Sequence, residues 1–193
     1  DITKALPVLK EIAGDIARIP LARRLEDCPK VLIVGEIYVR RDDFAVDELI
    51  QQLSGHGIIG KVSNVAEWFY YCDFVRHNEL KKKLGLMPWY RRVFSVEARE
   101  IIHWNIEHAY KHHVENSIRQ ALSRTGLLPE APHDMKKIMK NAEGHFVSRE
   151  LYSEISISSG VAATAMMDGY SGIVNISPFA CLIGRVIEGL FTP

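Results

Sequence analysis

Apolar runs and helically spaced apolar residues follow one another along the chain, and their order predicts strands separated by helices. Residues 30–39 are almost continuously Val, Ile and Leu, which is typical of a strand buried on both faces. Residues 58–65 predict a second strand. The β-branched run at 172–176, bounded by glycine and proline, predicts a third.

Helices connect and flank these strands. Asp42 and Asp43 are N-cap candidates for a helix that stops at Gly55 and Gly57. Strand, helix and strand then form a right-handed βαβ unit with parallel strands. Apolar spacing predicts further helices at 3–18, 93–125 and 135–148, and an Ala-rich helix after Gly160.

The predicted fold class is therefore α/β, a parallel sheet with βαβ units and a helical insertion. Residues 1–29 form a lead-in helix and linker, and residues 30–193 form the α/β domain. The insertion covers about 66–150, because that block is too long for a simple crossover connection.

Composition narrows the function classes. The 193 residues are 47% hydrophobic, which is enough for one sizeable core. Lys plus Arg and Asp plus Glu number 24 each, so no excess of positive charge points to a nucleic-acid partner. No apolar run reaches the roughly 20 residues of a membrane helix, and no signal-peptide pattern is present. We expect a cytoplasmic protein with no membrane or nucleic-acid partner. Three cysteines without a CxxC suit a reducing compartment.

Cys181 is the main candidate for chemistry, because it lies at the predicted turn from the third strand into a helix. Open α/β sheets present functional groups where the carboxyl ends of strands meet helix N-termini, and such a position favours a thiolate. The alternative is a small buried apolar residue. Four more candidates follow the first strand at the same edge: Gly35, Glu36, Arg40 and Arg41. They could contact a substrate or a neighbouring domain. The alternative is that they form an internal loop network.

Two further clusters have competing interpretations. Aromatic and basic residues are interleaved at 67–92, which could stack a nucleotide or single-stranded nucleic acid or simply combine a buried face with a solvated one. Glu100 and His103 form an ExxH pair, and His108 and His112 are four residues apart. A di-iron bundle needs a second helical ExxH, and the only other match, at 130–133, lies in a Pro-containing segment, so a solvated polar face is favoured.

The usual catalytic fingerprints are missing. The sequence contains no GxxxxGK[ST], no GxGxxG after a strand, no HExxH and no GxSxG. Catalytic residues and a nucleotide-binding site therefore stay unassigned.

Four motifs in one order carry a family resemblance: VGEIYVRRDDF at 34–44, AEWFYY at 66–71, SEISISSG at 153–160 and DGYSGIVNISPFACLIG at 168–184. The chain resembles the CoA-substrate-specific enzyme activases related to the activators and D components of 2-hydroxyacyl-CoA dehydratases. In such proteins an ATPase module couples ATP hydrolysis to low-potential electron transfer in anaerobic metabolism. Rossmann-like domains hold a 4Fe-4S cluster on cysteines, and this chain is similar to that part alone.

The resemblance implies a role for individual cysteines. The family pattern PFGCMPG stands here as PFACLIG, so Cys181 is retained, whereas Ala180, Leu182 and Ile183 depart from the pattern. Cys181 matches the last cluster-binding cysteine. Cys72 follows the second motif and could approach the same edge, although the family pattern does not require a cysteine there. Cys28 precedes the first strand and is expected to be structural.

The family would continue beyond Pro193 into another strand, so we expect a fragment whose sheet is truncated at its C-terminus. Alone it should lack ATPase activity and a stable cluster, since it offers too few thiolates. Partners would be the remaining domains or a dehydratase subunit, and the exposed sheet edge could promote a homodimer. The second hypothesis is a noncatalytic α/β interaction domain that docks a partner subunit.

Overall fold

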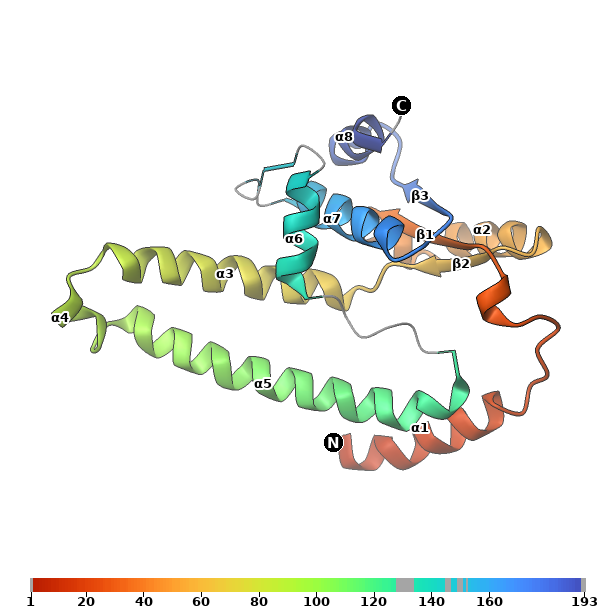
Figure 1. Cartoon of the computed structure of the whole chain (residues 1–193), viewed down its shortest axis with the longest axis horizontal. Coiled ribbons are helices and arrows are strands. Elements are labelled where there is room, and N and C mark those ends of the chain that lie inside the picture. Colours follow the sequence, from red (N-terminus) through yellow and green to blue (C-terminus); the bar gives the residue numbers. More distant parts are fainter. Residues whose placement is uncertain (1, 128–133, 145–146, 149–150, 152, 192–193) are drawn as a thin grey trace. The chain divides into compact units, whose positions relative to one another are not determined.

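The computed structural model describes residues 2–127, 134–144, 147–148, 151 and 153–191. Its α-helices and strands, in chain order, are α1 (Ile2–Ile16), β1 (Lys30–Gly35), α2 (Asp43–Gly55), β2 (Ile59–Val62), α3 (Ala66–Leu86), α4 (Trp89–Arg92), α5 (Val96–Leu122), α6 (Met135–Gly144), α7 (Glu154–Met167), β3 (Gly172–Ile176) and α8 (Leu182–Phe191). Short 3-10 turns lie at 25–27, 39–41 and 123–125. Figure 1 shows the order of these elements along the chain.

The described strands form one parallel sheet in the order β2-β1-β3. Lys30 pairs with Ile59 on one side of β1, and Gly35 pairs with Ile176 on the other. The prediction of three parallel strands in one sheet is confirmed, and the fold is α/β in this coarse sense. The first strand ends earlier than predicted, because Gly35 turns the backbone with a φ of 120°.

The chain divides into two compact units, described here separately. The helical unit comprises residues 1–22 and 73–131, and the sheet unit comprises residues 23–72 and 132–193. Helix α3 belongs to both, since its first turns lie in the sheet unit and the rest lies in the helical unit.

The sheet unit is built around β1 and α7. The central strand β1 is buried from Val31 to Gly35, as its apolar run predicts. Helix α7 packs on β1, β3, α6 and α8, and it is buried from Ser156 to Ala165. Its small side chains allow close approach: a Cβ at Gly160 would lie 2.5 Å from the carbonyl oxygen of Ile138 in α6.

Local capping explains the helix boundaries. The Asp42 carboxylate accepts a hydrogen bond from the Ala45 amide (3.1 Å) at the start of α2, as predicted. The Ser95 hydroxyl does the same for Ala98 at the start of α5 (3.1 Å). Gly126, with a φ of 66°, stops the chain after α5.

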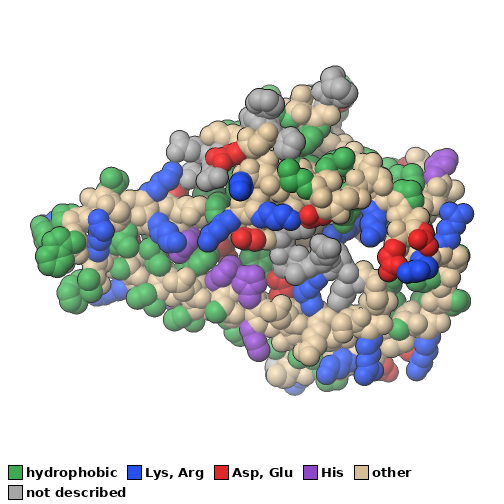
Figure 2. All heavy atoms as spheres, in the orientation of Figure 1, with side chains coloured by type: hydrophobic (Ala, Val, Ile, Leu, Met, Phe, Trp, Pro, Cys, Tyr) green, Lys and Arg blue, Asp and Glu red, His purple; other side chains and the backbone are tan. Residues whose placement is uncertain are grey.

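The helical unit combines α1, α5, α4 and most of α3. Helix α1 packs on α5, and Ala13 and Ala121 are the buried residues of those two helices. Around α4 the surface is apolar: Trp89 is 80% exposed and Phe94 is 82% exposed. Figure 2 shows hydrophobic side chains gathered at that end of the unit. The simpler interpretation of the aromatic segment, as a buried apolar face, is therefore wrong for Trp89.

None of the described helices has the length and apolar character needed to cross a membrane.

Candidate functional site

The loop after β1 is anchored to the end of β3. A Cβ at Gly35 would lie 1.9 Å from the carbonyl oxygen of Ile176, so this position requires glycine. The Glu36 amide donates to that same carbonyl (3.0 Å), and the Glu36 carboxylate accepts from the Val39 amide (2.9 Å). The carboxyl ends of β1 and β3 thus form one edge, as the parallel pairing predicts.

Arg40, in the 3-10 turn of this loop, is buried, with only 7% of its surface exposed. Its Nη1 donates to the carbonyl of Ser63, just after β2 (3.1 Å), and the Ser63 hydroxyl donates to the Glu67 carboxylate (2.5 Å). Burial lowers the pKa of Arg40, whereas the charges of Glu67, Glu154 and Glu36 raise it. One buried cation therefore lies within the electrostatic influence of carboxylates from three separate segments. We call this group the Arg40 cluster: Glu36, Arg40, Ser63, Glu67 and Glu154.

Glu154, the first residue of α7, ties that helix to the loop. Its Oε1 accepts a hydrogen bond from the Ile37 amide (3.1 Å). Burial raises the pKa of Glu154, and the charge of Glu36 raises it further, whereas Arg40 and the Ile37 hydrogen bond lower it. The negative charges of Glu36 and Glu154 repel each other, and the positive charge of Arg40 offsets this repulsion.

The candidate residues at 35–41 separate into two groups. Gly35, Glu36 and Arg40 belong to the internal network, which is the structural interpretation of this loop. Arg41 is exposed, and its backbone amide donates to the carbonyl of Tyr38 (2.9 Å). Of the two arginines, only Arg41 presents its side chain to solvent.

Cys181 lies in the turn from β3 to α8, as predicted. Its amide donates to the Pro178 carbonyl (3.1 Å), and its own carbonyl accepts from the Arg185 amide in the first turn of α8 (3.0 Å). The thiol is half-buried. The sequence therefore placed this residue correctly at the edge that also carries the loop after β1.

The turn keeps a glycine-favoured backbone although the family glycine is replaced. Ala180 has a φ of 62°, a left-handed conformation that costs an L-residue about 1–2 kcal/mol. Gly184, which the family pattern shares, is required by space, since a Cβ there would lie 2.2 Å from the Ser177 hydroxyl oxygen. The backbone thus presents Cys181 at a defined position.

The other two cysteines lie elsewhere in the sheet unit. Cys72 is exposed on α3 rather than at the end of β2. Cys28 precedes the amino end of β1, and its thiol contacts the Arg24 carbonyl (3.5 Å). Among the residues that the structure describes, no three His, Cys, Asp or Glu side chains are grouped to hold a metal ion.

The histidines of α5 differ from the predicted solvated face. His103 and His113 are exposed, as expected. His108 and His112 are half-buried, and their Nε2 atoms lie 3.1 Å apart. The prediction of a solvated face is wrong for these two, because Trp104 stacks on His108 (centroids 4.5 Å apart) and the His112 ring lies edge-on against His108 (4.4 Å). The second ExxH match, at 130–133, lies outside the described residues.

Comparison with protein-family models, curated proteins and solved structures finds no match. The site is therefore interpreted from its own residues. Each of the four motifs quoted above contributes to the edge described here: Glu36 and Arg40 come from 34–44, Glu67 from 66–71, Glu154 from 153–160 and Cys181 from 168–184.

Sequence reasoning missed Ser63, Glu67 and Glu154. A weak signal was present for the two glutamates, since each is the single acidic residue of its motif, AEWFYY or SEISISSG. A lone charge among apolar and small residues is costly to bury unless it has a partner. The partner, Arg40, lies far away in the sequence, so spacing alone could not identify it.

Proposed function

We propose that this chain is a Rossmann-like domain of an iron–sulfur protein related to the activators and D components of 2-hydroxyacyl-CoA dehydratases. In this proposal Cys181 supplies one thiolate to a 4Fe-4S cluster, and the domain serves as its scaffold in ATP-coupled electron transfer. The supporting observation is that residues from all four motifs of the resemblance meet at the edge that carries Cys181.

The donor chemistry fits one ligand of such a cluster, not a complete set. Cluster iron requires thiolates, usually four. The described residues hold no group of three metal-binding side chains, and Cys72 lies on α3. The remaining ligands would come from other domains of a longer protein or from a dehydratase subunit. When bound, the cluster would supply low-potential one-electron chemistry.

The Arg40 cluster would then set the position of the Cys181 turn. Arg40 and Glu36 hold the loop after β1, and the Glu36 amide is bonded to the last residue of β3. Because β3 leads directly into the Cys181 turn, loss of this network should displace the thiol.

The test measures iron and acid-labile sulfide in the natural protein purified under nitrogen. Cys181→Ala should lower both, whereas Cys28→Ala, a matched control at the amino end of β1, should leave them unchanged. The 193-residue chain alone, reconstituted with iron and sulfide and then desalted, should keep no stoichiometric cluster and should not hydrolyse ATP. Unchanged iron in Cys181→Ala would contradict the proposal.

A second candidate is a noncatalytic domain that docks a partner subunit at the same edge. Large apolar side chains are exposed around it: Phe179 is 94% exposed, Phe44 81% and Leu182 77%. Of these three, Phe179 lines a hollow of about 740 Å³, together with Val39, Ile176 and Pro178. Exposed apolar patches of this kind mark interaction sites. Unchanged iron in Cys181→Ala, together with loss of subunit binding in Phe179→Ser, would favour this function.

A further inference from the structure

His108 and His112 project from adjacent turns of α5 and bring two ring nitrogens together. Their Nε2 atoms are 3.1 Å apart, with the ring planes nearly perpendicular at 85°. Two imidazole nitrogens bound to one tetrahedral zinc ion, each at 2.0–2.1 Å, lie about 3.3 Å apart. The pair therefore already has nearly the spacing that a shared ion requires.

The ring of His108 is held in place by stacking. Trp104 lies against His108 with an interplanar angle of 13° and a centroid distance of 4.5 Å. His77, from α3, stacks on Trp104 at 3.9 Å. Residues of α3 and α5 thus restrict the rotation of the His108 ring, which reduces the entropy lost when its nitrogen binds a ligand.

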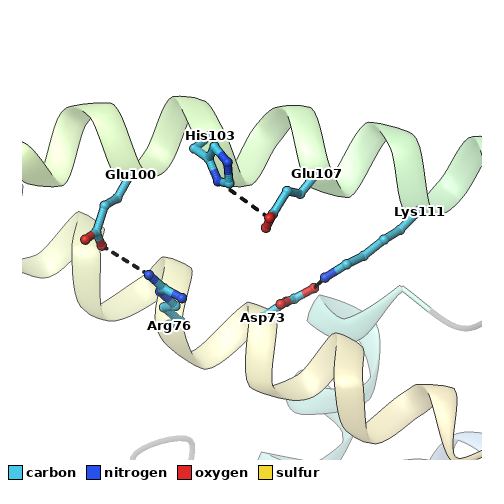
Figure 3. A network of polar contacts seen from close by, with 6 residues as sticks. All are labelled: Asp73, Arg76, Glu100, His103, Glu107 and Lys111. Atoms are coloured by element: carbon cyan, nitrogen blue, oxygen red, sulfur yellow. Dashed lines mark hydrogen bonds and ion pairs between the residues drawn. The ribbon is translucent and has the colours of Figure 1, made fainter.

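The surroundings of His108 favour its neutral ring. Burial lowers the pKa of His108, and the positive charges of His112 and Lys111 lower it further, whereas Asp73 on α3 raises it. The Lys111 ammonium group forms an ion pair with the Asp73 carboxylate (Nζ to Oδ2, 2.6 Å). Figure 3 shows this ion pair together with a second one, between Arg76 and Glu100, and the contact of His103 with Glu107 (3.6 Å) on α5. A neutral ring keeps a lone pair for a metal at pH 7.

We propose that His108 and His112 together bind one divalent first-row transition ion through their Nε2 atoms. Imidazole nitrogen suits zinc, copper and nickel. Without metal the contact requires one Nε2–H to donate to the other Nε2. On binding, that proton moves to Nδ1 of the same ring, so neither imidazole changes its charge and both lone pairs point at the ion.

The site is a two-histidine one. No third metal-binding side chain completes a group here among the described residues, so the other coordination positions are open to water or to a partner's group. The ion would stiffen α5 and fix the His108 ring against Trp104. This site lies in the helical unit and does not depend on Cys181 or on the function proposed above.

The experiment titrates Zn²⁺ into metal-free protein by calorimetry. The parent carries Cys→Ser changes at 28, 72 and 181, which remove thiols that would compete for zinc. His112→Ala should weaken binding on the order of tenfold or more, because one of two ligands is lost. The matched control His113→Ala removes the neighbouring exposed histidine and should bind as the parent does.

A second readout locates the ion. In long-range ¹H–¹⁵N spectra, zinc should shift the Nε2 signals of His108 and His112 and leave those of His103 and His113 in place. His112→Gln preserves much of the side-chain volume and tests the ligand separately from packing, and helix content by circular dichroism confirms folding. Equal losses in His112→Ala and His113→Ala, or zinc shifts spread over all four histidines, would overturn the proposal.

Discussion

Replacing Arg40 by glutamine removes the one cation of the Arg40 cluster while retaining part of its stem. The hydrogen bond to the Ser63 carbonyl (3.1 Å) involves a charged donor, and its loss costs about 1.5–3 kcal/mol. One buried methylene contributes about 0.8 kcal/mol. The surrounding carboxylates are half-buried and partly solvated, so losing their counter-charge adds only about 1 kcal/mol. We expect Arg40→Gln to lower the free energy of unfolding by about 3–5 kcal/mol, which is the combined effect of these three losses.

A double-mutant cycle tests the cause of that loss. Glu154→Gln keeps an oxygen for the Ile37 amide but removes a charge that has no partner once Arg40 is gone. The double variant should be less destabilised than the sum of the two single variants, by about 1 kcal/mol.

The measurement is urea denaturation at pH 7, followed by Trp68 fluorescence in a Trp89→Phe, Trp104→Phe background. Trp68 belongs to the sheet unit, so the signal reports the unit that contains Arg40. A loss below about 1 kcal/mol for Arg40→Gln, or strictly additive effects, would refute the view that Arg40 stabilises the edge by neutralising these carboxylates.

Three further outcomes are expected from the same denaturation assay. Gly160→Ala should lower the free energy of unfolding by about 1–3 kcal/mol, because the new methyl group meets the Ile138 carbonyl at 2.5 Å. Its control, Gly189→Ala in α8, has nothing within 4 Å of the new methyl group and should raise that free energy by about 0.5–1 kcal/mol. Equal effects of the two substitutions would contradict the packing argument. Ala180→Gly should be neutral or stabilising by up to about 1 kcal/mol, since it relieves a φ of 62°; a clear loss would mean the turn is not strained. The pKa of Glu154 is raised in the folded state, so ionisation of this carboxyl opposes folding above that pKa. As the pH falls from 7 through the folded-state pKa toward the unfolded-state pKa, the wild type should gain stability relative to Glu154→Gln. A stability difference that does not change with pH would show that the pKa of Glu154 is not perturbed.

The sheet could be predicted from the sequence because its strands and turns are encoded by residues that are close together in the chain. β1 and β3 are mainly apolar, β-branched runs bounded by turn residues, and Asp42 caps α2 through a contact three residues away. The position of Cys181 also follows from the adjacent strand and helix. Each of these features depends on neighbours in the sequence.

The helices α3 and α7 were harder to recognise. In α3, aromatic and basic residues give no clear apolar stripe, although Tyr71 and Leu80 are buried. In α7 nearly every side is buried by small residues, so no 3.6-residue period distinguishes an inner from an outer face. The Arg40 cluster was equally hidden, because Glu67 and Glu154 join Arg40 only through the tertiary fold.

The burial of α7 has a consequence for how the sequence can vary. A saturation-mutagenesis library would find few acceptable codons from Ser156 to Ala165, because larger side chains collide with α6 or the sheet and charges lose their water. Helix α5 has one buried residue, Ala121, along its whole length, so it should accept most polar replacements. Selection for a stable fold alone would therefore preserve α7 and let the exposed positions of α5 drift, and an exposed position of α5 that resists replacement would reveal a demand other than folding.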